Sequence, residues 1–185
     1  MRLSATATAI AGVIELCNPG FEDSRGAFQR LFDAAEWRDC WGDRLVGQVN
    51  HSRTTSVGAL RGLHLQLPPA AESKLVRCIR GRVFDVAVDL RAGSASLGQW
   101  HGVELSPGGA NALCIPEGCA HGFQVLEAPA ELIYVHSGPY APADEWAARW
   151  ADPRLAIAWP LPVAQLSARD AAHPLLPDDF AGLPF

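Results

Sequence analysis

Residues 82–90 read Arg-Val-Phe-Asp-Val-Ala-Val-Asp-Leu, and this stretch decides the predicted fold. Two sets of side chains alternate along it with the two-residue period of a β-strand. The sets are Phe84, Val86, Val88 and Leu90 against Val83, Asp85, Ala87 and Asp89. Residues 75–79 form a second candidate strand just upstream, and the Arg80-Gly81 pair between the two is predicted as a tight hairpin turn.

Short apolar segments of the same kind continue along the chain, separated by the scattered glycines and prolines. The further candidate strands are residues 100–105, 112–115, 123–126 and 132–136. Ser106-Pro107-Gly108-Gly109 and Pro116-Glu117-Gly118 are predicted as turns between them. Many short strands with frequent turns are typical of a sandwich or barrel, so the sequence predicts an all-β fold.

Helical pattern is sparse. Residues 33–40 and 143–150 are the two candidate helices, and both are short. The chain has 185 residues and no linker or repeat, and its last forty or so residues are predicted to pack onto the main body. We therefore expect one domain, residues 1–185, with a full hydrophobic core.

Composition excludes several classes of function. The net charge of −5 provides no global basic field to attract nucleic acid or a membrane surface. Only Arg2 flanks the N-terminal apolar stretch, which Glu15 interrupts, so no signal peptide or membrane span is predicted. The five cysteines are odd in number and form no C-x-x-C pair, which favours reduced thiols in a cytoplasmic protein.

Arg61, His64, Lys74 and His121 form the densest polar group, at the ends of neighbouring candidate strands. Taken singly, each is more often a structural or solvated residue, but the mouth of a barrel would bring them together. Metal-binding cupins use a His-x-His pair followed by a glutamate, and here Leu65 and Gln66 follow His64. We therefore predict neither a metal site nor a cofactor.

The order of short motifs resembles the dTDP-4-dehydrorhamnose 3,5-epimerase family from about Phe21 to about Pro174. The N-terminal motifs are residues 23–28, 48–50, 60–64, 74–77, 83–91 and 98–100. The C-terminal motifs are residues 115–118 with 120–123, 140–142 with Glu145, 152–153, 159–160, and 166–167 with Asp170. Each motif is weak alone, but their common order is specific.

The resemblance implies a jelly-roll (cupin-like) homodimer that acts on a dTDP-linked 4-keto-6-deoxyhexose. By position, His64 matches the catalytic base, Asp170 its carboxylate partner, and Tyr134 the acid on the opposite face of the sugar. Lys74 and His121 match groups that line the sugar, and Arg61 matches a ligand of the diphosphate. The other matching positions in the nucleotide pocket are Arg25, Gln48, Asn50, Tyr140 and Glu145. The segment before Phe21 or its neighbours is expected at the dimer interface.

The chemistry of these residue types agrees with the roles. The protons on C3 and C5 are acidic because both carbons flank the C4 ketone, and imidazole is suited to remove them near neutral pH. A carboxylate on the other ring nitrogen fixes the tautomer, and a lysine or histidine near O4 stabilises the enolate oxygen. A phenol can return the proton from the opposite face, and an arginine suits a diphosphate.

Several alternatives remain open. Without the resemblance, Asp170 is a helix cap or surface residue, and Tyr134 is a core tyrosine. His51, His101, His136 and His173 match no functional position and are predicted to be structural. The chain departs from the family at Arg30, where a glutamate is usual, and at Val135 and Ala147. Other possible functions are a single-centre epimerase, an enzyme for a different nucleotide sugar, a non-catalytic sugar-nucleotide binder, and a metal-dependent cupin.

Overall fold

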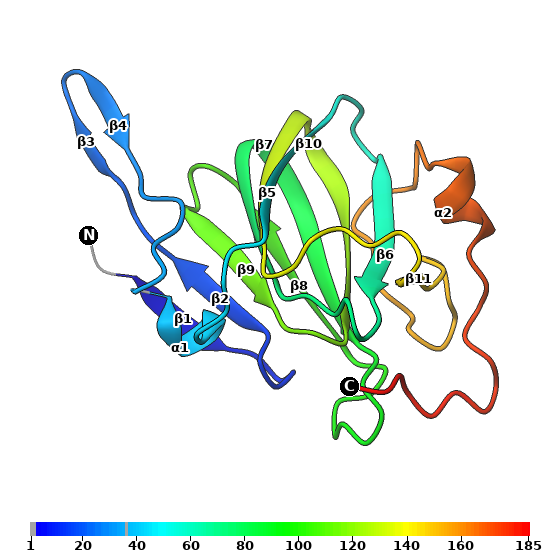
Figure 1. Ribbon diagram of the computed structural model, residues 1–185. Coiled ribbons are helices and arrows are strands. Elements are labelled where there is room, and N and C mark those ends of the chain that lie inside the picture. The colour runs from blue at the N-terminus through cyan, green and yellow to red at the C-terminus, as the bar shows by residue number, and fades with distance from the viewer. Residues whose placement is uncertain (1–2, 36) are drawn as a thin grey trace.

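The computed structural model describes residues 3–35 and 37–185, which fold almost entirely into β-strands (Figure 1). The strands are β1 (Ser4–Ala7), β2 (Ile14–Cys17), β3 (Phe21–Asp23), β4 (Gly26–Phe28), β5 (Gln48–Thr54), β6 (Leu60–Gln66), β7 (Lys74–Asp89), β8 (Trp100–Leu105), β9 (Asn111–Ile115), β10 (Cys119–His136) and β11 (Glu145–Ala147). The helices of the described residues are α1 (Arg38–Trp41) and α2 (Ala168–Ala172). The prediction of an all-β fold with short peripheral helices is confirmed.

Two long strands, β7 and β10, organise the fold, and they pair antiparallel from Lys74↔His136 to Asp89↔Cys119. Each strand takes different neighbours along its length. The first part of β7 pairs with β9 and the last part with β8, while the first part of β10 pairs with β6 and the last part with β5. The result is two layers, β1-β2-β9-β7-β10-β5 and β8-β7-β10-β6-β11, which together form the jelly roll.

The hairpin predicted at Arg80-Gly81 is wrong, because β7 continues through these residues without reversing. Gly81 has a φ of +71°, and a Cβ there would lie 2.4 Å from the carbonyl oxygen of Glu127. The register between β7 and β10 also shifts between Val125 and Leu132. Gly81 therefore bends the strand from one layer into the other without reversing it, as a bulge does. Residues 123–126 and 132–136, predicted as separate strands, are likewise parts of β10.

The helix predictions were less accurate. The helix predicted over residues 33–40 is reduced to α1, and residue 36 lies outside the described residues. The helix predicted over residues 143–150 is wrong, because its centre forms β11. β11 pairs with the edge of β6 from Glu145↔Gln66 to Ala147↔His64. Pairing with an open sheet edge has here overridden the local helical pattern.

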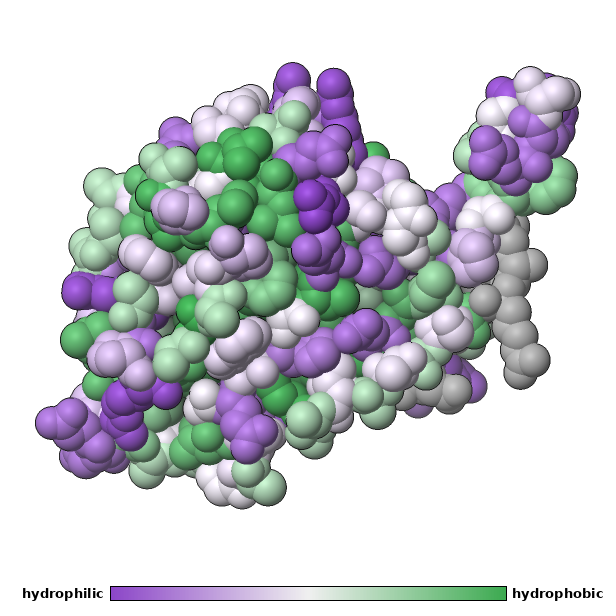
Figure 2. Space-filling view, turned by 180° about the vertical axis from the view of Figure 1, so that it is seen from behind, coloured by the Kyte–Doolittle hydropathy of each residue, from purple (hydrophilic) through white to green (hydrophobic). Residues whose placement is uncertain are grey.

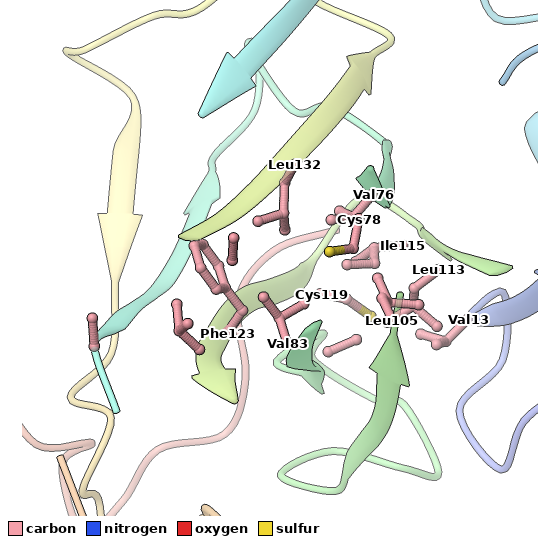
Figure 3. Packing of buried hydrophobic residues seen from close by; sticks show 14 of the residues in the cluster. Val13, Val76, Cys78, Val83, Leu105, Leu113, Ile115, Cys119, Phe123 and Leu132 are labelled. Atoms are coloured by element: carbon pink, nitrogen blue, oxygen red, sulfur yellow. The ribbon is translucent and has the colours of Figure 1, made fainter. Parts of the chain in front are cut away.

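The core lies between the two layers (Figure 3). Side chains from both bent strands enter it, including Val76, Cys78, Val83, Phe123 and Leu132. A second cluster packs the C-terminal segment onto the outer face of the layer that contains β8, β6 and β11. A third cluster packs α1 onto the outer face of the layer that contains β2 and β9. The predicted packing of the C-terminal segment against the body is confirmed.

The β3–β4 hairpin projects away from the rest of the molecule (Figures 1 and 2). It forms its own two-stranded sheet, and its aromatic residues Phe21 and Phe28 are 56% and 63% exposed. In residues 3–35 and 37–185, no helix has the length and apolar character needed to cross a bilayer.

Candidate active site

A cavity of about 740 Å³ opens between the two layers, and residues 165–167, 169 and 170 form part of its wall. Every site residue predicted from the sequence lines it except Arg25. They are Gln48, Asn50, Arg61, His64, Lys74, His121, Tyr134, Tyr140, Glu145 and Asp170. The cavity has a volume typical of a site for a small organic ligand.

His64 and Asp170 form a close pair at the wall of this cavity. Nε2 of His64 on β6 lies 2.8 Å from Oδ1 of Asp170 on α2. Ser167 is the N-cap of α2, and its hydroxyl accepts a hydrogen bond from the backbone N–H of Asp170. Burial alone would raise the pKa of Asp170, but the hydrogen bond and charge of His64, together with Ser167 and His173, lower it. Asp170 is therefore a buried carboxylate that orients His64, and the N-cap of α2 is Ser167.

Tyr134 enters the cavity from the other layer, on the part of β10 that pairs with β5. Its ring packs edge-on against His121, with the ring centroids 5.9 Å apart, and its hydroxyl accepts a hydrogen bond of 3.3 Å from Ser52. Burial raises the pKa of the Tyr134 phenol well above its usual range. The phenol therefore keeps its proton at neutral pH, as an unperturbed phenol also does.

His121 is fixed by a second buried histidine–carboxylate pair. Its Nε2 lies 2.7 Å from Oδ1 of Asp85 on the neighbouring strand β7. Both side chains are almost fully buried. Burial raises the pKa of Asp85, while the charge and hydrogen bond of His121 oppose that rise. Such a pair holds the imidazole in one orientation beside the cavity.

The mouth of the cavity carries groups suited to a polar, charged ligand. Arg61 is exposed there, as is Asn50 on the outer strand β5, and Gln48 on the same strand is half-buried. The hydroxyl of Tyr140 donates a 2.8 Å hydrogen bond to Glu145, which is also paired with Arg169. Burial raises the pKa of Glu145, but Arg169 and Tyr140 lower it further than burial raises it. These groups provide cationic, anionic and neutral contacts side by side.

Arg25 is the one predicted site residue that the chain does not bring to its own cavity. It lies at the turn of the projecting β3–β4 hairpin, where its side chain is 87% exposed and pairs with Asp23 at 2.7 Å. A role in ligand binding would therefore require the hairpin to reach a different cavity.

His64, Asp170 and His173 together offer three potential metal ligands within 4.8 Å of one another. Nε2 of His173 lies 3.4 Å from Oδ1 of Asp170 and makes no hydrogen bond there. Imidazole and carboxylate groups are ligands that Zn²⁺ takes in proteins. The cluster was not foreseen from the sequence, where His173 was assigned a structural role, and metal-free chemistry at His64 stays a prediction.

Comparison with known proteins agrees with this arrangement. Residues 7–178 match the family described as dTDP-4-dehydrorhamnose 3,5-epimerase. The chain belongs to this family. The resemblance drawn from the sequence motifs is therefore confirmed.

Individual epimerases are similar over most of their length. The dTDP-4-dehydrorhamnose 3,5-epimerase of Salmonella typhimurium is 43% identical over 171 residues, covering 91% of this chain and 93% of that protein. A crystal structure of the dTDP-6-deoxy-D-glucose-3,5-epimerase of Legionella pneumophila, in complex with dTDP-4-keto-L-rhamnose, is 39% identical with a TM-score of 0.91. It covers 100% of this chain and 99% of that one. A dTDP-4-dehydrorhamnose 3-epimerase of Streptomyces niveus is 39% identical, covering 87% of this chain and 78% of that protein.

The departures from the epimerase family pattern lie outside the cavity lining. Arg30 forms an ion pair of 3.2 Å with Asp33. Val135 is buried on the face of β10 opposite to Tyr134, and Ala147 pairs with His64 across β11 and β6.

Among the further side chains that line the cavity and were not assigned to the site from the sequence are Glu72, His136 and Arg169. His136 lies two residues after Tyr134 on the same strand, so it shares the face of Tyr134. This two-residue spacing is the sequence feature that could have placed His136 in the site. Glu72 and Arg169 carry no comparable local signal.

Proposed function

We propose that this chain epimerises dTDP-4-dehydro-6-deoxy-D-glucose at C3 and C5 to give dTDP-4-dehydro-L-rhamnose. Membership of the family and the names of its relatives support the reaction. The observation that carries the mechanism is the position of His64 with Asp170 on one layer and Tyr134 on the other, both facing one cavity. A sugar ring bound between them would present opposite faces to a base and an acid.

His64 acts as the base in this mechanism. Its Nε2 is occupied by the Asp170 carboxylate, so Nδ1 is the nitrogen that takes the proton from C3 or C5. Asp170 stays ionised because the pKa of its carboxyl is lowered, and it stabilises the imidazolium that forms. The electron pair of the broken C–H bond moves onto O4 and gives an enolate.

Lys74 and His121 stabilise the negative charge on O4, and Tyr134 reprotonates the carbon from the opposite face. The Lys74 ammonium is held near His64 by a 3.3 Å hydrogen bond to the His64 carbonyl oxygen. Preorganised donors of this kind contribute most where charge develops in the transition state. Arg61, Gln48, Asn50, Tyr140 and Glu145 bind the nucleotide and diphosphate at the mouth.

We also propose that the working form is a homodimer. The projecting β3–β4 hairpin exposes two phenylalanines, and an isolated two-stranded hairpin is at best marginally stable in water. A second copy would cover the hairpin and could receive Arg25 in its cavity. The five cysteines are free thiols, three of them buried, which favours the reducing environment of the cytoplasm.

Solvent-deuterium incorporation tests the reaction directly. The protein is incubated with dTDP-4-dehydro-6-deoxyglucose in D₂O, and NMR follows the signals of C3 and C5. We expect label at both carbons. Label at C3 alone would make the chain a single-centre epimerase. This function is the second candidate, because a dTDP-4-dehydrorhamnose 3-epimerase is 39% identical to the chain. Tight binding without label at either carbon would identify a non-catalytic binder.

A further inference from the structure

Lys74 is the only lysine in the sequence. It begins β7 at the wall of the cavity and is 8% exposed. A buried ammonium is costly unless it is paired and hydrogen-bonded. The groups around Lys74 therefore decide whether it carries a charge.

A buried carboxylate and a buried imidazole lie beside it. Nζ of Lys74 is 3.5 Å from Oε1 of Glu72, and the other carboxylate oxygen, Oε2, is 3.0 Å from Nδ1 of His136. Glu72 and His136 are each 8% exposed, and both line the same cavity. Glu72 thus bridges His136 and Lys74, with one oxygen toward each.

Two carboxylates act on the charge of Lys74, Glu72 from the segment before β7 and Glu145 from β11. Two histidines lie close by: the backbone carbonyl of His64 on β6 accepts a hydrogen bond from Nζ, and the imidazole of His136 on β10 contacts Glu72. Burial lowers the pKa of Lys74, and Glu72, followed by Glu145, opposes this. Glu72 is the only one of these carboxylates in direct contact with Nζ.

We propose that Glu72, anchored by His136, is a positioning residue that keeps the Lys74 side chain charged and fixed at the cavity wall. The inference rests on the proposed function, in which Lys74 stabilises the enolate oxygen. As an ammonium, Lys74 carries the positive charge that opposes the charge on O4, and as an uncharged amine it would lose most of this effect. His136 donates Nδ1–H to Glu72, which orients the carboxylate toward Lys74. Neither Glu72 nor His136 needs to contact the sugar for this role.

The single lysine allows a test that does not depend on catalysis. Protein labelled with ¹³C-lysine gives one side-chain Cε resonance, whose pH titration reports the charge of Lys74. We expect Glu72→Gln to move this titration to lower pH, while Glu104→Gln, on the surface of β8 and paired with Arg82, leaves it unchanged. Coinciding titration curves for wild type and Glu72→Gln would overturn the proposal.

Kinetics supply the second measurement. We expect Glu72→Gln to lower kcat by roughly ten- to a hundredfold, with KM within a few-fold and the alkaline limb of the kcat profile at lower pH. Glu72→Asp keeps the charge and should recover part of the loss. An unchanged alkaline limb in Glu72→Gln would contradict the role.

Two variants of His136 separate anchoring from simple packing. Asparagine carries an amide N–H close to the position of Nδ1, so His136→Asn should keep most of the activity. His136→Leu fills similar space without a donor and should lower kcat, and equal activity of the two variants would exclude an anchoring role.

If wild type shows no deuterium exchange, the proposed function fails while the lysine titration still decides the Glu72–Lys74 coupling. If wild type exchanges and Lys74 titrates alike with and without Glu72, only this inference fails.

Discussion

His64 is the proposed base, and Asp170 acts on it through one hydrogen bond. Substitution of His64 should therefore reduce activity more than substitution of Asp170. We expect His64→Asn to reduce deuterium exchange by at least roughly a hundredfold, since the base is lost. Asp170→Asn should be milder but still severe, because asparagine can favour the wrong imidazole tautomer. Calorimetry should show dTDP binding close to wild type in both variants. Exchange within a few-fold of wild type in His64→Asn would remove His64 from the role of base.

Tyr134 allows exchange to be separated from inversion. In Tyr134→Phe, His64 can still remove a proton and return deuterium to the original face, because the partly buried phenol on the other layer is the only group altered. We therefore expect labelled sugar with retained configuration, measured by NMR of C3 and C5. Inverted product formed at the wild-type rate would show that a different group delivers the proton.

The cluster of His64, Asp170 and His173 makes the metal-free mechanism testable. A metal bound there would occupy the imidazole that the mechanism needs as a base. We expect purified protein to contain no stoichiometric transition metal, and chelator treatment to leave the exchange rate unchanged. Elemental analysis that finds full occupancy, with metal and activity lost together, would support a metallo-cupin instead.

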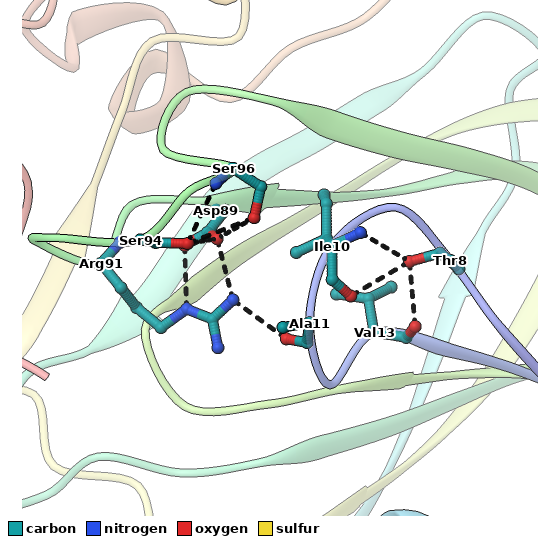
Figure 4. Close-up of polar contacts among 8 residues, drawn as sticks. All are labelled: Thr8, Ile10, Ala11, Val13, Asp89, Arg91, Ser94 and Ser96. Carbon is teal, nitrogen blue, oxygen red and sulfur yellow. Dashed lines mark hydrogen bonds and ion pairs between the residues drawn. The ribbon is translucent and has the colours of Figure 1, made fainter.

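At the scale of single elements, the end of β7 carries a buried ionic network (Figure 4). Oδ2 of Asp89 accepts hydrogen bonds from Arg91, Ser94 and Ser96, at 2.8, 2.5 and 2.6 Å. Burial alone would raise the pKa of Asp89, but these bonds lower it far below its usual range. The ionised carboxylate therefore stabilises the loop that connects β7 to β8.

Asp89→Asn should lower the free energy of unfolding by about 2 to 4 kcal/mol at pH 7. Because the folded-state pKa is depressed, this contribution is complete above the unfolded-state pKa of about 4 and is lost as the pH falls toward the folded value. Urea unfolding at pH 7 and at lower pH measures it. Asp23→Asn is the matched control, because Asp23 makes the same contacts with Arg25 on an exposed hairpin and should change stability little. A difference between wild type and Asp89→Asn that stays constant with pH would contradict the assignment.

Local pattern was sufficient for the strands but not for their connections. The period of two in residues 82–90 predicted a strand correctly, and the same holds for residues 75–79. Arg80-Gly81 suits both a hairpin turn and a bulge, and the choice is made by β10, which pairs along both sides of the bend. That partner lies about fifty residues further along the chain, beyond the reach of a local pattern.

At the scale of the whole molecule, the site is assembled from segments far apart in the sequence. His64 and Asp170 are separated by 106 residues, and Glu72 and His136 by 64. Spacing alone could not pair them, and the first pair was anticipated only through the order of family motifs. Glu72 and His136 were missed because no motif marked them and the antiparallel register that brings them together is a property of the folded sheet.

Arg25 lies on a hairpin that projects from its own chain, so a dimer that inserts the hairpin into the partner cavity should show complementation. We expect light scattering to give twice 19.8 kDa, and Arg25→Ala and His64→Asn each to be impaired alone. When the two variants are unfolded and refolded together, mixed dimers form in which an intact His64 cavity receives an intact Arg25 from the other chain. Exchange activity should then rise above the sum of the separate variants, because one of the two cavities in each mixed dimer is complete. A monomer at micromolar concentration, or a mixture no more active than its parts, would mean that Arg25 does not act across an interface.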